Sequence, residues 1–311
     1  NACSKCYTDQ TLEWNIAKAD EWYGDKLDSR QRARARAVAA AQTGKEDSVE
    51  HLLALLEVED IPAWRATFLS LLIPGNNNPA VLNAGRKGLS ATDPVERAAA
   101  VRLLTGTPGS DDLLRPLLQD PVRLVRLDTE WALSRELAPD SPARKELDTY
   151  MALSLDQPAG RLRLGQDLAN RGDLIGALKE IEIAQKWDEF SPGIRAAHAQ
   201  VLTVLGRPAE AGAEYRRAAE LASEDYMLSM NAALAFAEAG NLTDAESAFR
   251  IAVKRNPAFD RAWYNLGLLL AQTGRQPEAV EALRHAMNLA PAVADYPYAL
   301  ATVLLQIGDI I

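Results

Sequence analysis

The chain has 311 residues, of which 48% are hydrophobic and 25% charged, so it can fill a packed core and disorder is not expected. Its formal net charge of −9, without any basic stripe, argues against a nucleic-acid partner. Apolar runs stay shorter than the roughly 20 residues that span a bilayer. Alternating strand-like runs are missing too, so the sequence predicts an all-α fold.

Residues 1–27 are predicted to be an N-terminal segment with one helix over 9–23. Cys3 and Cys6, the only cysteines, have a spacing found in local disulfides, zinc sites, redox sites and haem-attachment sites. Haem attachment also needs a histidine where Tyr7 stands, and nothing nearby completes a zinc or redox site. These residues favour an inert pair or a possible disulfide, with no metal and no cofactor. Without an initiator Met or signal peptide, we expect a processed chain or a fragment.

The helix over 9–23 is expected to bury one stripe of its surface. Leu12, Ile16, Ala19 and Tyr23 recur at helical spacing and form this stripe. Trp14 and Trp22 lie outside it and are expected to seal the end of a solenoid.

Residues 28–140 repeat a helical pattern with a looser period. Pro62, Pro94 and Pro121 are each predicted to begin a helix, the last two after a capping Asp. An Arg follows each proline inside an apolar run, at positions 65, 97 and 126. The pattern resembles HEAT-type repeats, and this resemblance implies that recurring Asp and Arg link successive repeats by hydrogen bonds. The arginines at 30, 32, 34 and 36 are expected to be a solvated surface.

Residues 141–311 follow a boundary at 137–142 and repeat every 34 residues. Glycines stand at positions 172, 206, 240, 274 and 308, and alanines follow the first four by five and by twelve residues. Each glycine is expected to end the first helix of a pair in a left-handed conformation, and the alanines to lie where two helices approach closely. The pattern, with Ala262-Trp263-Tyr264-Asn265-Leu266-Gly267 as its best copy, resembles the tetratricopeptide repeat.

Together these patterns predict an α-α superhelix, a right-handed solenoid of HEAT-like helix pairs followed by tetratricopeptide repeats. The second part is expected to hold about four pairs and a final unpaired helix over 294–307. Val303, Leu304 and Ile307 on that helix are expected to lack cover. We therefore expect self-association through this end.

The tetratricopeptide architecture implies a concave groove, lined by the first helix of each pair, that binds a protein or peptide partner. Counting back thirteen, ten, six and two residues from each glycine selects the side chains that face it. They include Gln166, Asn170, Gln200, Met227, Met230, Leu234, Arg261, Tyr264, Leu268, Gln272 and Tyr298. Asn231 and Asn265 match the asparagines with which some members grip a carboxylate, but Leu162 and Ala196 replace the lysines, so no such clamp is expected.

Residues with catalytic patterns are lacking. His51, His198 and His285 are far apart, and none has a metal-ligand partner at helical spacing. Phosphate-binding loops and nucleophile motifs are absent as well. The sequence therefore predicts a binding protein and no enzyme.

The first residues also resemble a family of exported multihaem cytochrome c-like proteins. Asn1-Ala2-Cys3-Ser4-Lys5-Cys6-Tyr7-Thr8-Asp9 and the later Trp22-Tyr23-Gly24 carry this resemblance, with Tyr7 in place of the family's histidine. It implies the non-haem C-terminal part of a periplasmic or otherwise exported protein, in which Cys3 and Cys6 would be oxidised. The alternative is a haem-carrying electron-transfer protein with haem attached at Cys3 and Cys6.

Overall fold

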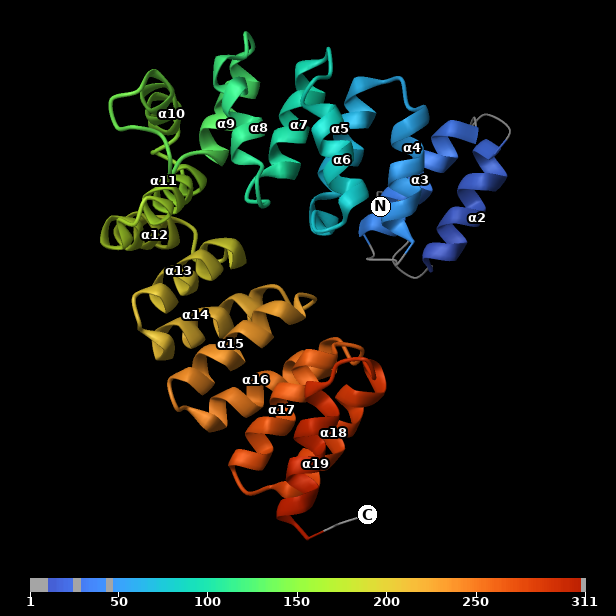
Figure 1. The fold of residues 1–311 in the computed structure, drawn as a ribbon, viewed down its shortest axis with the longest axis vertical. Helices are drawn as coiled ribbons and strands as arrows, with labels where there is room; N and C mark the ends of the chain where they lie inside the picture. Colours follow the sequence, from blue (N-terminus) through green and yellow to red (C-terminus); the bar gives the residue numbers. More distant parts are fainter. Residues whose placement is uncertain (1–10, 25–28, 43–46, 309–311) are drawn as a thin grey trace. The chain divides into compact units, whose positions relative to one another are not determined.

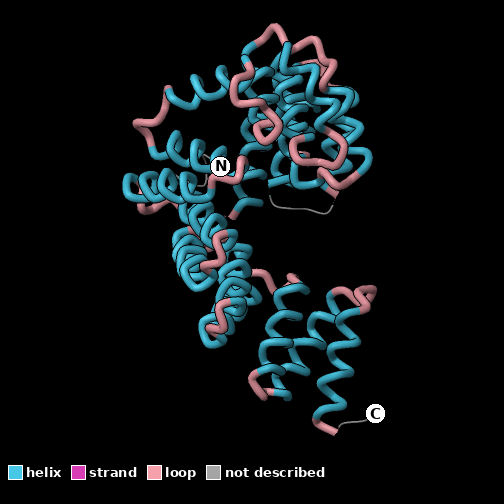
Figure 2. Tube along the Cα trace, turned by 60° about the vertical axis from the view of Figure 1, so that its left-hand side comes forward, coloured by secondary structure: helices cyan, strands magenta, loops and turns pink. Residues whose placement is uncertain are grey.

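The computed structural model describes residues 11–24, 29–42 and 47–308, and all regular structure in these ranges is helical (Figures 1 and 2). This confirms the all-α prediction. No helix of the described ranges is long and apolar enough to cross a membrane. The helices are α2 (Leu12–Tyr23), α3 (Ser29–Gln42), α4 (Ser48–Val58), α5 (Pro62–Leu71), η2 (Ile73–Gly75), α6 (Pro79–Gly88), α7 (Pro94–Leu104), α8 (Asp111–Leu114), η3 (Arg115–Gln119), α9 (Arg123–Ala132), α10 (Pro142–Ala152), α11 (Pro158–Asn170), α12 (Leu174–Trp187), α13 (Pro192–Val204), α14 (Pro208–Leu221), α15 (Tyr226–Glu238), α16 (Leu242–Arg255), α17 (Asp260–Gln272), α18 (Gln276–Leu289) and α19 (Asp295–Gln306).

The chain divides into two compact units, residues 1–147 and 148–311, and the division falls within α10. In unit 1, helices α3, α5, α7 and α9 pack one against the next, with α4 and α6 beside them. Two of the predicted helix starts, Pro62 and Pro94, are confirmed. The third helix, α9, begins at Arg123 because Asp120 accepts a hydrogen bond from the Val122 amide and holds Pro121 in the preceding turn.

Arginines link successive helices of unit 1, as the sequence predicted. Arg65 on α5 donates to Glu96 on α7. Arg97 on α7 donates to Asp120, just before α9. Arg126 on α9 donates to Glu146 on α10. Each of these arginines also donates to backbone carbonyls of the turn before its own helix, and Arg65 reaches the last turn of α4 as well. A planar guanidinium with five donors can bridge a turn and a carboxylate in this way.

The prediction that the first basic cluster is solvated is wrong for Arg34. Its side chain is buried and donates two hydrogen bonds to Glu59, at 2.8 and 2.7 Å. Arg34 is thus the first member of the same series, 31 residues before Arg65. Arg30, one turn earlier on the same face of α3, reaches the same loop and pairs with Asp60 at 2.7 Å, but this pair stays exposed.

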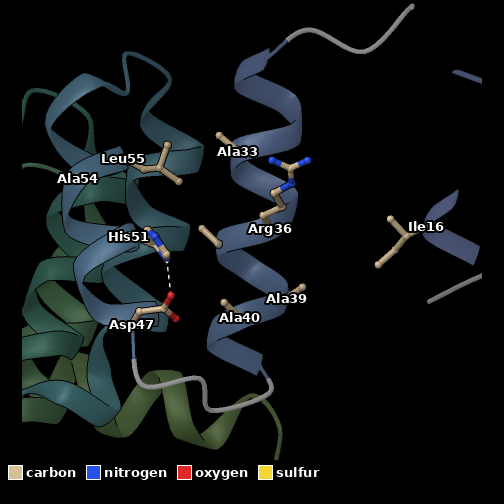
Figure 3. Close-up of a pocket in the computed structure, with 10 residues that line it drawn as sticks. Ile16, Ala33, Arg36, Ala39, Ala40, Asp47, His51, Ala54 and Leu55 are labelled. Atoms are coloured by element: carbon tan, nitrogen blue, oxygen red, sulfur yellow. Dashed lines mark ion pairs between the residues drawn. The ribbon is translucent and has the colours of Figure 1, made fainter. Parts of the chain in front are cut away.

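The predicted apolar stripe of α2 is also wrong. Ile16 is 58% exposed and Tyr23 is more than half exposed, whereas the polar Asn15 is buried. Ile16 stands across an open cavity from α3, without packing against it (Figure 3).

Unit 2 consists of helix pairs joined by tight turns: α11 with α12, α13 with α14, α15 with α16 and α17 with α18, followed by α19 (Figure 1). The predicted left-handed glycines are confirmed, since Gly172, Gly206, Gly240, Gly274 and Gly308 all have φ between 71° and 87°. The expected close approaches are present as well. A Cβ on Gly267 would lie 2.7 Å from Leu283 Cγ, so α17 and α18 need glycine there.

One continuous core runs through unit 2 and includes Ile181, Phe249 and Leu283. It reaches α19, where Val303 is only 4% exposed. The prediction that Val303 lacks cover is therefore wrong, because the preceding pair already buries it. Ile307 and its neighbour Leu305 are exposed.

Candidate functional site

The predicted groove residues lie on α11, α13, α15, α17 and α19, the first helices of the pairs in unit 2. We call the surface that they form the first-helix face. Each helix ends at a left-handed glycine, which fixes where its side chains point relative to the next pair. Positions counted back from the glycines therefore recur along the stack.

Ten of the eleven predicted residues are at least partly accessible. Met227, Leu234, Leu268 and Tyr298 are exposed apolar or aromatic side chains, with Tyr298 at 77%. Gln166, Gln200, Arg261 and Gln272 are exposed polar ones, and Asn170 and Tyr264 are half-buried.

Met230 is the exception. It is 5% exposed and belongs to the core of unit 2, so the prediction that it faces a partner is wrong. Met230 lies three residues after Met227 and about 60° from it around the helix axis, and this rotation takes its side chain from the exposed face into the core of unit 2.

The sequence analysis missed Val204, which is 67% exposed. It stands two residues before Gly206, in the position that Asn170 and Gln272 occupy before their glycines. The same counting rule would have found it. The first-helix face thus carries amides and Val204 on α11 and α13, and most of its exposed apolar side chains on α15, α17 and α19.

One ring contact and one hydrogen bond stiffen the apolar part of this face. The rings of Tyr264 and Tyr296 lie with their centroids 4.9 Å apart. The hydroxyl of Tyr296 donates a hydrogen bond of 2.7 Å to Asp260. Burial, followed by the bond to Asp260, raises the pKa of Tyr296 to about 12, so this phenol stays protonated under ordinary conditions. Tyr264 is thereby held at the surface by a neutral, fixed neighbour.

The histidines are held by other groups. His51 pairs with Asp47, His198 contacts Gln185 through Nδ1 at 2.7 Å, and His285 stacks on Trp263. Burial lowers the pKa of His198, which favours the neutral ring. The described part of the chain contains no group of three His, Cys, Asp or Glu side chains that could hold a metal ion. Cys3 and Cys6 lie outside the described residues.

Unit 1 holds a cavity of about 610 Å³ between α3, α4 and Ile16 of α2 (Figure 3). Alanines from α3, together with Leu55, make most of its wall apolar, and Arg36, Asp47 and His51 add polar groups. Figure 3 shows Ile16 alone on the far side. The sequence did not point to this cavity, since small residues on a helix more often mark packing.

Comparison with known proteins identifies part of unit 2. The model of a tetratricopeptide repeat family matches residues 230–297, which span α15 to the start of α19. Residues 230–297 are tetratricopeptide repeats. The five left-handed glycines, 34 residues apart, extend the same geometry over the rest of unit 2.

Solved structures show a weak likeness to this chain. A crystal structure of MamA protein is 18% identical with a TM-score of 0.46, over 49% of this chain and 83% of that chain. MamA from Desulfovibrio magneticus RS-1, residue 41 to the end, is 21% identical with a TM-score of 0.44, over 50% and 87%. YrrB, described as a TPR protein with an unusual peptide-binding site, is 21% identical with a TM-score of 0.43, over 70% and 98%. No curated protein matches the chain. None of these findings supports the predicted kinship with multihaem cytochromes.

Proposed function

We propose that this chain is a protein-interaction scaffold whose first-helix face binds a segment of a partner protein. The observation that carries the proposal is the run of exposed apolar side chains, Leu234, Leu268 and Tyr298, on successive first helices of the tetratricopeptide repeats. Monomeric proteins rarely leave large contiguous apolar patches open, and such patches commonly mark interaction sites.

The chemistry of the face suggests what it binds. Met227 adds an adaptable thioether beside Leu234, and the amides of Gln166, Asn170 and Gln200 offer donors and acceptors at the other end. An extended or helical segment with apolar anchors suits such a surface. The proposal includes no carboxylate-gripping clamp, because Leu162 and Ala196 stand where its lysines would be. The proposal includes no catalytic step.

The test is capture of partners from an extract of the native organism, followed by mass spectrometry. We expect Leu234→Ser with Leu268→Ser to lose the partners that the wild type retains. The matched control, Ile175→Ser with Ile251→Ser, changes exposed apolar residues on the second helices α12 and α16. The control should keep the same partners. A face variant that captures the same set as the wild type would contradict the proposal.

We also propose that the protein is exported and that its C-terminal helix associates with a second copy. Export rests on the resemblance of the first residues alone. Fractionation of the native cells that finds the protein only in the cytoplasmic fraction would contradict export.

The proposed association is supported by the exposed side chains of Leu305 and Ile307. Light scattering that gives a monomer at high concentration would exclude it.

A further inference from the structure

Glu130 on α9 is a buried carboxyl group to which no arginine of the series donates a hydrogen bond. Its side chain is fully buried, and among the described residues neither of its two oxygens accepts a hydrogen bond from an arginine; the group close enough to share a proton with it is the carboxylate of Glu146. The carboxylates of Glu59, Glu96 and Asp120, which are also buried, each accept from an arginine. A buried ionised carboxylate without such a partner is costly, so a group in this position favours its neutral form.

The surroundings of Glu130 explain why it lacks an arginine. Glu146 on α10 accepts two hydrogen bonds of 2.8 Å from Arg126 and a further one from Arg123. Both cations beside Glu130 are therefore engaged with Glu146, whose negative charge also acts on Glu130. On the other elements packed against α9, Arg102 of α7 pairs with Asp128, Arg97 of α7 with Asp120, and Arg115 of η3 with Glu136.

The two glutamates respond in opposite directions to this environment. Burial, followed by the charge of Glu146, raises the pKa of Glu130 to about 7. Hydrogen bonds from Arg126 hold the pKa of Glu146 below its usual value. One carboxyl group is thus neutral in mildly acidic solution while its neighbour is ionised, a division of roles that adjacent acids commonly adopt.

We propose that Glu130 and Glu146 form a proton-operated latch on the junction of α9 and α10. With Glu130 neutral, Arg126 and Arg123 hold Glu146, and the first turns of α10 stay bound to α9. When Glu130 ionises, its buried carboxylate competes with the partly exposed Glu146 for the same arginines, and the junction loosens. Because the chain leaves unit 1 through α10, the latch controls the freedom of the chain at that division.

The direction of the effect follows from linkage. The folded state holds the proton of Glu130 more tightly than the unfolded chain, in which a glutamate has its ordinary pKa near 4.5. This group therefore stabilises the junction fully below about pH 4.5, and its contribution is lost as the pH rises toward about 7.

The direct test is a titration of the side-chain carboxyl carbons by NMR on protein with labelled glutamate. Glu130→Gln identifies the signal, because glutamine imitates the neutral acid. We expect the signal of Glu130 to titrate near neutral pH. A midpoint near that of ordinary glutamates would overturn the proposal. This measurement needs only the folded wild type, with the signal assigned through the backbone if the variant does not fold.

Hydrogen exchange of α10, corrected for the intrinsic effect of pH, tests the mechanical part. In the wild type we expect a severalfold loss of protection over 142–147 between pH 6 and pH 8. Glu130→Gln should abolish this loss, and the exposed control Glu57→Gln should leave it as in the wild type. Equal pH dependence in the wild type and Glu130→Gln would contradict the latch.

Discussion

The guanidinium of Arg97 donates two paired hydrogen bonds to the carboxylate of Asp120, from Nε to Oδ2 at 2.8 Å and from Nη2 to Oδ1 at 3.0 Å. Its third nitrogen donates to the carbonyls of Ala91 and Thr92. One side chain thus joins two turns of unit 1 and the start of α9. Both partners are largely buried, so the pair is desolvated and cannot exchange its bonds for water.

Arg97→Ala should lower the free energy of unfolding of unit 1 by about 3–5 kcal/mol, because it leaves Asp120 buried without its partner. Arg97→Lys should cost less, since lysine keeps the charge but cannot make the paired hydrogen bonds. Urea unfolding followed by circular dichroism measures both. Arg217→Ala, which removes an exposed pair with Glu220, is the control and should cost less than about 1 kcal/mol. Equal costs for the buried and exposed pairs would contradict this account.

Glu59 should make the protein sensitive to acid. Hydrogen bonds from Arg34 lower its pKa to about 2, against 4.5 for an ordinary glutamate. Its contribution to stability is therefore complete above about pH 4.5 and disappears as the pH falls toward 2. Thermal melts between pH 2 and pH 6 should show a flatter profile for Glu59→Gln than for the wild type. Parallel profiles would mean that Glu59 has the same pKa in the folded and unfolded chain.

Gly240→Ala should destabilise unit 2 by about 1–2 kcal/mol, the cost of a left-handed alanine. The residue has φ of 76°, and a Cβ there would meet no atom within 4 Å, so strain in the backbone is the only cause. Gly193→Ala is the matched control. Gly193 lies in the first turn of α13 without a positive φ, and its Cβ would only touch Ser191 Oγ at 4.0 Å. It should be neutral or stabilise by up to about 1 kcal/mol. Urea unfolding decides between these outcomes, and a loss at Gly193 as large as at Gly240 would refute the argument.

Met227 and Met230 should separate stability from binding. Met230→Ala removes a core side chain and should cost about 2–5 kcal/mol. Met227 is 41% exposed, and Met227→Ala should change stability by less than about 0.5 kcal/mol while weakening capture of the partner. Chemical unfolding and capture, measured on the same preparations, check both. If Met227→Ala destabilises as much as Met230→Ala, the side chain is part of the core and the first-helix face must be redrawn.

Much of the first-helix face could be predicted from the sequence. The interval of 34 residues set the register, and ten of the eleven chosen side chains have accessible surface. The rule failed at Met230, which belongs to the core of unit 2, and it was not applied at Val204. In unit 1 the irregular period hid Arg34, although its distance from Arg65 nearly equals that from Arg65 to Arg97.

By itself the sequence determined two of the three helix starts marked by proline and the five glycines that end the first helices of unit 2, because these depend on backbone geometry within a few residues. Only the tertiary structure decided that Arg34 binds Glu59, that Ile16 stands exposed, and that Glu130 is buried beside Glu146 without an arginine of its own. Which side of a helix loses water depends on the neighbour that packs against it. That neighbour comes from another part of the chain, and no local pattern records its distance or its charge.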